Sequence, residues 1–374
     1  MTRRRLLAVT GVAPWPLRGG FSLRAAHLLE HLATEWDVTL IAACALDRDA
    51  IPWTASDPHE VIAVPLAERW TPVPRRRADM RPLIQAVDTV LASQNPAAAL
   101  LWNGAEFLAF NRDGFPHAVA DRIDCGTLEW LRAVRHTPWS IGRALWYARY
   151  ERRVVRSLDA TIVAGQRDAR ALETVSGTKR VVLIPNGVHP QPSPRFDAES
   201  SRPTIAFTGT LSYYANIDAV RYFVRRMWPA IQREVANARF LIVGRNPRRR
   251  ILALRGLPGV EVRSDVADMA AVLQEAWLAI APMRRGTGVK NKVLEAWAAG
   301  RPVVMTPLAS NGLQLDDRMR ELVASNERDF CEHVVGLLRD TERRHAYGNA
   351  AHTLVARRHS WRESGQAVSR LLQE

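Results

Sequence analysis

Two of the three lysines in this 374-residue chain lie in one short segment, Gly288-Val-Lys-Asn-Lys-Val-Leu-Glu295. All other basic side chains except histidine are arginines, so a compact ammonium group is rare in this chain. The segment opens a helix that we predict over Val289–Ala299, and the N–H groups and dipole of a helix N-terminus attract anions. Because the same dipole disfavours cations in the first turn, Lys290 and Lys292 indicate a phosphate contact more than a solvated surface.

Glycines follow two neighbouring strands that we predict in the same half of the chain. Gly209 and Thr210 come after one strand, and Gly244 and Arg245 end the next. A glycine at a strand end lets the backbone approach a phosphate closely, although each one alone is more often an ordinary turn. Their position at successive strand ends favours phosphate binding for the pair.

The elements that would position these residues alternate between strand and helix along the whole chain. A strand begins at residue 5, a loop ends at Gly19-Gly20, and a helix and a second strand follow. The alternation pauses at 189–203, a stretch with four prolines, and then resumes. We therefore predict an α/β protein with two Rossmann-like parallel-sheet domains, 1–188 and 204–360, joined by a linker over 189–203. In such a fold a ligand binds in the cleft at the carboxyl ends of the strands.

Composition excludes several classes of protein. The apolar fraction of 47% and charged fraction of 24% are typical of globular domains, and no run is long enough to span a membrane. Three scattered cysteines form neither a disulfide framework nor a zinc site, which favours a reducing cytoplasm. The net charge of +14 is dispersed and matches no nucleic-acid-binding motif, so it fits phosphate-bearing substrates or an anionic membrane surface better. The knot Arg75–Arg77 beside Trp70 is one candidate for membrane contact.

The N-terminal segment could be taken for a targeting signal or a cofactor motif. Arg3-Arg-Arg resembles the start of a signal peptide, but the apolar run stops at Pro14, so we interpret it as mature sequence. Gly19-Gly20 lacks the spacing of a dinucleotide fingerprint, and no acidic residue closes the next strand, which argues against NAD.

Four motifs in order resemble one enzyme family. They are Pro185-Asn-Gly-Val188, Thr208-Gly-Thr-Leu-Ser-Tyr-Tyr-Ala-Asn-Ile-Asp218, Leu241-Ile-Val-Gly-Arg-Asn-Pro247 and the segment 286–304. Together they resemble the retaining GT-B glycosyltransferases of family 4, and within these the sugar transferases of bacterial exopolysaccharide systems. The resemblance covers nearly the whole chain and is strongest after about residue 150.

This resemblance implies a cytoplasmic enzyme that moves a hexose from a nucleotide-sugar, such as a UDP- or GDP-sugar, to a hydroxyl group with retention. It implies no metal and no cofactor, since the nucleotide-sugar is a substrate. The acceptor would be a carbohydrate or a lipid-linked sugar in cell-surface polysaccharide synthesis, with an anionic membrane surface as a further partner and no nucleic acid. It also implies that a C-terminal helix over 361–374 packs back on the first domain.

The resemblance assigns roles to individual residues. Lys290, Lys292 and the loop residues Thr287, Gly288 and Val289 would bind the donor diphosphate. Glu295 would hold the ribose, and Val266 would contact the nucleobase through its backbone. In the first domain, Gly19 and Gly20 would face the donor phosphates. Asp124, where relatives place a histidine, would contact the sugar or acceptor or instead cap the following helix.

Two departures from the family pattern leave alternatives open. Thr287 stands where relatives carry the first glutamate of a paired signature, and the histidine of the first domain is missing. The chain could therefore be a catalytically silent GT-B subunit that binds a sugar or a partner. A nucleotide-sugar 2-epimerase shares the fold but needs acid–base carboxylates and histidines that this sequence does not place in the cleft.

Overall fold

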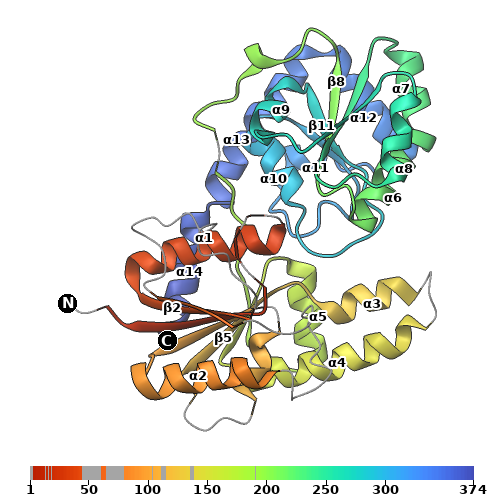
Figure 1. Cartoon of the computed structure of the whole chain (residues 1–374). Coiled ribbons are helices and arrows are strands. Elements are labelled where there is room, and N and C mark those ends of the chain that lie inside the picture. The colour runs from red at the N-terminus through yellow and green to blue at the C-terminus, as the bar shows by residue number, and fades with distance from the viewer. Residues whose placement is uncertain are drawn as a thin grey trace. The chain divides into compact units, whose positions relative to one another are not determined.

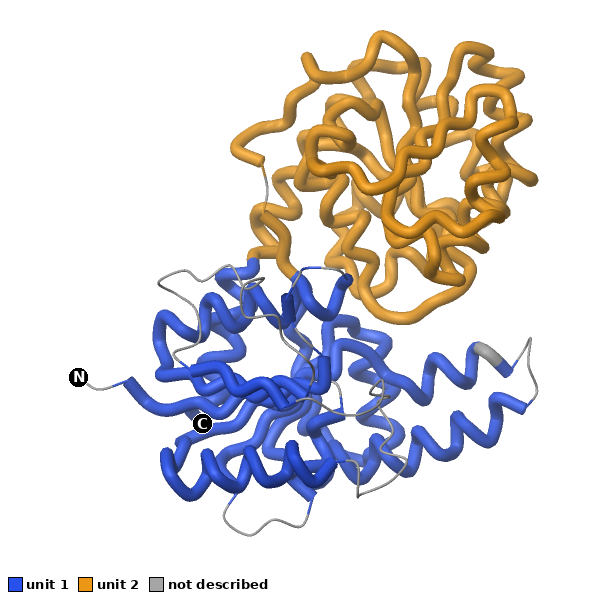
Figure 2. Tube along the Cα trace, viewed as in Figure 1, with its two compact units in different colours: residues 1–186, 361–374 blue, residues 187–360 orange. Residues whose placement is uncertain are grey.

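The computed structural model divides the chain into two compact units (Figure 2). It describes residues 3–12, 14–15, 17, 19–43, 60–64, 80–102, 104–110, 115–134, 139–189 and 191–374. Trp70 and Arg75–Arg77, which we named for membrane contact, lie outside these residues. Unit 1 comprises Met1–Asn186 and Trp361–Glu374, and unit 2 comprises Gly187–Ser360. No helix among the described residues has the length and apolar character of a membrane span.

Unit 1 is built on a parallel sheet with the strand order β3-β2-β1-β4-β5-β6-β7 (Figure 1). Its strands are β1 (Arg5–Thr10), β2 (Asp37–Ala42), β3 (Glu60–Ala63), β4 (Ala98–Trp102), β5 (His117–Ile123), β6 (Ala160–Val163) and β7 (Val181–Leu183). Alternate side chains of each strand enter different cores. Leu6 and Ala8 of β1 pack on one face of the sheet, and Leu7 and Val9 pack on the other.

Helices cover both faces of this sheet. They are α1 (Gly20–Glu35), α2 (Arg81–Gln94), α3 (Gly126–Val134), α4 (Ser140–Ser157), α5 (Gln166–Ser176) and α14 (Trp361–Leu371), with a 3₁₀ turn η3 (Ala105–Ala109). The core on one face joins α1 and α14, and the core on the other joins α2 and α4. The apolar periodicity predicted most of these helices, and α2 was not among the predicted elements.

Helix α14 belongs to unit 1 although it follows unit 2 in the sequence (Figure 2). Trp36 donates from Nε1 to the Ser369 hydroxyl at 2.9 Å, and that hydroxyl donates to Glu35 at 2.5 Å. A β-carbon on Gly365 would lie 2.4 Å from the ring of His31, so only glycine allows α1 and α14 to pack this closely.

Unit 2 contains a second parallel sheet with the order β10-β9-β8-β11-β12. Its strands are β8 (Thr204–Thr208), β9 (Arg239–Gly244), β10 (Val260–Ser264), β11 (Leu278–Ala281) and β12 (Val303–Met305). The helices are α6 (Tyr214–Arg226), α7 (Trp228–Glu234), α8 (Arg249–Leu252), α9 (Met269–Glu275), α10 (Asn291–Ala298), α11 (Asp317–Arg320), α12 (Glu327–Arg339) and α13 (Thr341–Arg358). The strand order reverses at β8 and β11, the type of position where open α/β sheets bind ligands.

One predicted helix is wrong in extent. The apolar period over 218–234 predicts a single helix, but α6 and α7 are separate and meet at Met227, which has non-helical backbone angles. Pro229 explains the break, because proline is tolerated in the first turn of a helix but not in its interior. The chain therefore ends α6 and begins α7 so that Pro229 lies in a first turn.

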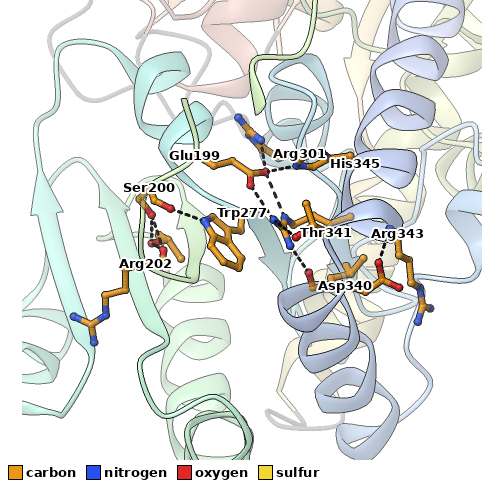
Figure 3. A network of polar contacts seen from close by, with 12 residues as sticks. Glu199, Ser200, Arg202, Trp277, Arg301, Asp340, Thr341, Arg343 and His345 are labelled. Carbon is orange, nitrogen blue, oxygen red and sulfur yellow. Dashed lines mark hydrogen bonds and ion pairs between the residues drawn. The ribbon is translucent and has the colours of Figure 1, made fainter. Parts of the chain in front are cut away.

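The segment 189–203, which we interpreted as a linker, is assigned to unit 2 and is held there by buried polar contacts (Figure 3). Glu199 accepts hydrogen bonds from Arg301 at 2.8 Å and from Arg344 at 3.0 Å. Ser200 accepts a hydrogen bond from the indole of Trp277 through its carbonyl oxygen. Both arginine side chains are almost fully buried, so their charges depend on Glu199 for compensation.

Candidate functional site

Most candidate residues lie on loops at the carboxyl ends of β8, β9, β10 and β11 in unit 2. The loop that precedes α10 has left-handed backbone at Gly286 and Gly288, with φ of 98° and 68°. Side chains other than glycine rarely adopt these angles, so the two glycines fix the path of the loop. Helix α10 begins at Asn291 rather than at Val289, because this turn occupies the residues before it.

We expected Lys290 in the first turn of α10, but it is the N-cap residue that precedes this turn. Its side chain is buried and folds back on the loop, where Nζ donates to the carbonyl oxygens of Thr287 at 2.6 Å and Gly288 at 2.8 Å. The ammonium group therefore compensates two inward-facing carbonyl groups. This contact makes Lys290 a residue that shapes the glycine loop.

Lys292 lies in the first turn of α10 and joins that helix to the loop after β8. Its Nζ donates to the Asn216 side chain at 2.8 Å and lies 3.6 Å from the centre of the Phe207 ring. Asn216, at the start of α6, donates in turn to the carbonyl oxygen of Thr210 at 2.9 Å. One polar chain thus connects Thr210, Asn216 and Lys292 across the point where the strand order reverses.

The environment of Lys292 is unfavourable for its charge. Desolvation lowers the pKa of Lys292 well below its ordinary value, and the nearby Lys290 lowers it further, whereas Glu295 raises it. Desolvation also raises the pKa of Glu295, against the opposing effect of Lys292 and Arg245. Arg245 itself is exposed at the end of β9. A half-buried, desolvated ammonium group with too little negative charge around it is a favourable place for an anion to bind.

Gly209 and Gly244, the two glycines at strand ends, are needed for different structural reasons. A β-carbon on Gly244 would lie 1.7 Å from the carbonyl oxygen of Gly209, so Gly244 is needed for the loops after β8 and β9 to pack together. A β-carbon on Gly209 would lie 3.0 Å from Nζ of Lys292 and 2.9 Å from the Asn216 amide nitrogen. Gly209 therefore leaves room for Lys292, whereas Gly244 serves loop packing.

Two further candidates, Val266 and Val289, lie on the loops of unit 2 that follow β10 and precede α10. The Val266 side chain packs against the small core formed by Leu241, Val243 and Val272. The Val289 side chain packs against the main core of the unit. Neither side chain can make a polar contact, so any role in ligand binding falls to their backbone groups. Among the described residues, no group of three His, Cys, Asp or Glu side chains is arranged to hold a metal ion.

The remaining candidates, Gly19, Gly20 and Asp124, belong to unit 1. Gly19 is the N-cap of α1 with extended backbone, and a β-carbon there would meet nothing within 4 Å. Packing therefore does not require this glycine. Its N–H group donates to the Ser22 hydroxyl at 2.9 Å, which fixes the start of the helix.

Asp124 follows a strained residue at the end of β5. Ile123 has a φ of 67°, which is costly for a β-branched side chain, and the pairing of β5 with β6 is irregular there. The N–H groups of Gly126 and Thr127 at the start of α3 donate to Glu151, at 2.7 and 3.1 Å. Glu151 thus accepts hydrogen bonds from two groups at the start of the helix, and both roles named for Asp124 stay predictions.

Sequence reasoning missed Asn216 and Glu151 as functional or structural partners. Asn216 lies within the quoted motif 208–218, but its contact with Lys292 joins residues 76 positions apart. The only available signal was that an amide side chain stands at the start of a predicted helix. Glu151 is buried in the middle of α4, where its neighbours in sequence suggest only a surface carboxylate.

Comparisons with known proteins agree with this architecture. Residues 202–340 match the family described as "Glycosyl transferases group 1". No curated protein matches the chain in sequence. Among solved structures, sucrose-phosphate synthase from Thermosynechococcus elongatus is similar with a TM-score of 0.77 at 16% identity, covering 99% of this chain and 98% of that one.

Two other solved structures are similar over the whole length of both chains. WaaG, a glycosyltransferase involved in lipopolysaccharide biosynthesis, has a TM-score of 0.70 at 14% identity and covers 98% of this chain and 99% of its own. HepE of Anabaena in complex with UDP has a TM-score of 0.69 at 13% identity, with 99% of each chain covered. The chain therefore has the GT-B fold with two parallel-sheet units, and residues 202–340 of its second unit match the group 1 glycosyltransferases.

Proposed function

We propose that this protein transfers a glycosyl group from a nucleotide-sugar to a hydroxyl acceptor, with retention at the anomeric carbon. One observation carries the proposal. Lys292 is a poorly solvated cation at the carboxyl ends of the strands of unit 2, and residues 202–340 of that unit match the group 1 glycosyltransferases. When the sugar leaves, negative charge grows on the nucleoside diphosphate. A fixed ammonium group beside helix N–H groups stabilises such charge without having to reorganise.

Each residue of this site has a distinct part in this mechanism. Lys292 would contact the leaving diphosphate, and Asn216 would hold its ammonium group in position. Lys290 would keep the glycine loop in shape so that the N–H groups of α10 point toward the anion. Glu295 would accept hydrogen bonds from the ribose; desolvation raises its pKa, and the nearby Lys292 and Arg245 oppose this shift and favour the ionised acceptor.

The finer parts of the proposal concern substrates and setting. A UDP-sugar is the first donor to test, because solved structures of the similar HepE contain UDP and UDP-glucose. We propose a carbohydrate or lipid-linked acceptor, a role in cell-surface polysaccharide or glycoconjugate synthesis, and action in the cytoplasm at the inner membrane face. The lysines and the helix N-terminus would make a metal ion or other cofactor unnecessary.

The test begins with binding and continues to turnover. A panel of UDP- and GDP-sugars is screened by thermal shift, where a ligand at 100 times its Kd stabilises the protein by about 2.7 kcal/mol. Each donor that binds is then incubated with the enzyme, and slow release of the nucleoside diphosphate is measured. The anomeric configuration of the product, read by NMR with an acceptor, tests retention.

A second candidate is a GT-B subunit that binds a nucleotide-sugar without turning it over. Thr287 favours it, because a hydroxyl group stands where the related enzymes place a carboxylate against the sugar. Binding of a donor with no hydrolysis and no transfer to any acceptor in a panel would support this candidate and exclude the enzyme. Interconversion of UDP-sugar epimers would instead indicate a 2-epimerase.

A further inference from the structure

Tyr213 is an exposed aromatic residue beside the glycine loop, and the mechanism proposed above does not use it. It is the N-cap residue of α6 and is 41% exposed. A β-carbon on Gly286 would lie 3.4 Å from the Tyr213 hydroxyl oxygen and 3.3 Å from the β-carbon of Ala215. The glycine loop therefore runs past the Tyr213 hydroxyl, and Gly286 leaves space for a ligand group between them.

The backbone of Tyr213 is tied to the polar chain that holds Lys292. Its N–H group donates to the carbonyl oxygen of Thr210 at 3.2 Å, and the same oxygen accepts a hydrogen bond from the Asn216 amide at 2.9 Å. The N–H group of Asn216 donates to the carbonyl oxygen of Tyr213 at 3.0 Å. Since the Asn216 side chain also accepts from Lys292, hydrogen bonds fix Tyr213 relative to the ammonium group.

The ring of Tyr213 is supported from the side by Tyr214. The two rings meet edge to face, with centroids 4.8 Å apart and an interplanar angle of 63°. A tyrosine side chain has only two side-chain torsions before its hydroxyl, so holding it in place costs little conformational entropy. Tyr213 therefore offers a hydroxyl group at a defined place beside the loop, where a ligand meets it without rearrangement.

The groups around this hydroxyl suit a sugar better than a phosphate. The loop residues Gly286, Thr287 and Gly288 carry no charge. The nearest ammonium group, Nζ of Lys290, lies 3.9 Å from the β-carbon position of Gly286, but it donates to the carbonyl oxygens of the loop. A phenol hydroxyl is neutral and both donates and accepts hydrogen bonds, as the hydroxyl groups of a sugar do.

We propose that the Tyr213 hydroxyl hydrogen-bonds a hydroxyl group of the transferred sugar and so takes part in selecting the donor. This inference rests on the proposed nucleotide-sugar donor, in which the sugar is bonded directly to the phosphate that Lys292 would contact. A hydroxyl held beside the glycine loop, next to that ammonium group but not at it, then faces the sugar. A site that hydrogen-bonds a substrate hydroxyl discriminates against sugars that lack it.

The test compares each nucleoside diphosphate with its nucleotide-sugars, because only the latter carry the sugar. Dissociation constants are measured by calorimetry for UDP, UDP-glucose, UDP-galactose and UDP-N-acetylglucosamine, and for GDP and GDP-mannose. Tyr213→Phe removes the hydroxyl and keeps the ring. Tyr214→Phe makes the same change at the neighbouring exposed tyrosine and is the matched control, and Lys292→Met is the reference for a phosphate contact. Thermal unfolding verifies that each variant is folded.

Tyr213→Phe should weaken binding of the nucleotide-sugar about three- to tenfold and change binding of the free nucleoside diphosphate by less than about twofold. Lys292→Met should weaken both ligands, and Tyr214→Phe should bind both as the wild type does. Analogues of the bound donor that each lack one sugar hydroxyl identify the contact. One of them should bind the wild type more weakly by the same factor, and Tyr213→Phe should not distinguish it from the complete donor.

The inference and the proposed function fail in different ways. Equal weakening of both ligands in Tyr213→Phe would assign the hydroxyl to the phosphate, and unchanged affinity for both would remove it from the site. Either result overturns the inference, as does a wild type that binds UDP or GDP but none of these nucleotide-sugars. A wild type that binds neither nucleoside diphosphate and none of the donors would instead refute the proposed donor site itself.

Discussion

Replacing Lys292 by methionine distinguishes a catalytic role of this lysine in the proposed donor site from a structural role. Methionine keeps the apolar stem and removes the ammonium group that Asn216 and the Phe207 ring now hold. A unit charge about 4 Å from a phosphate is worth about 4 kcal/mol at an effective dielectric of about 20. Loss of one charge-stabilising group in active sites typically amounts to about 3 kcal/mol. We therefore expect kcat/KM to fall by about 100- to 1000-fold.

The thermal stability of Lys292→Met should not fall together with its activity. The folded-state pKa of Lys292 lies below its value in the unfolded chain, because burial disfavours the ammonium group. At a pH below both values the charged side chain therefore destabilises the fold, and this penalty fades as the pH rises from the folded-state pKa toward about 10.5. Lys292→Met removes the penalty, so the Tm at neutral pH should stay the same or rise although activity is lost.

The assay compares three proteins with a donor that the wild type turns over. Steady-state kinetics and thermal unfolding are measured for wild type, Lys292→Met and Lys179→Met, the last being an exposed lysine of unit 1. Lys179→Met should match wild type in both measurements. Near-normal kcat/KM in Lys292→Met, or a large loss of Tm that accounts for the lost activity, would refute the assignment.

Three further outcomes follow from the geometry. Binding of UDP at alkaline pH should be accompanied by uptake of a proton on Lys292, because the negative diphosphate raises the depressed pKa of this lysine. Calorimetry in buffers of different ionisation enthalpy measures this proton uptake, and its absence would count against contact between UDP and Lys292. Gly244→Ala should destabilise unit 2 by more than about 3 kcal/mol in urea, since its β-carbon would collide with Gly209; a loss below about 1 kcal/mol would show that the loop can shift. Glu199→Gln should cost about 3–5 kcal/mol, because it leaves the buried Arg301 without its carboxylate, and an unchanged unfolding midpoint would disprove that dependence.

Local patterns predicted the elements well because strands and helices of this fold bury long apolar runs. The residue patterns over 98–102 and 140–158 predict a strand and a helix, and β4 and α4 agree with these ranges to within one residue. The strand β3 was missed because it is a four-residue edge strand with one buried residue, so its apolar run Val61-Ile-Ala63 is short. The break between α6 and α7 was missed because the apolar period continues through it while Pro229 ends the hydrogen bonding.

The candidate site was predicted as a set of residues but not as a geometry. The glycine-flanked loop and its lysines could be found from residue types, because two of the three lysines of this chain lie there. That Lys290 turns back onto Thr287 and Gly288 follows from the left-handed glycines, whose angles a sequence does not specify. The partner of Lys292 lies 76 residues away and that of Arg301 lies 102 residues away, separations at which spacing carries no information.

The return of α14 to unit 1 affects the order in which the protein can fold during synthesis. Unit 2 is continuous in sequence and can complete its core without any residue that is translated after it. Unit 1 must wait, because Val368, Leu371 and Leu372 fill the core beside α1 and are translated after all of unit 2. Until then the nascent first unit exposes the apolar face of α1 and the adjoining Trp36 to chaperones and to other nascent chains. A fragment of residues 187–360 should thus fold alone, whereas residues 1–186 should aggregate unless a peptide of residues 361–374 is supplied.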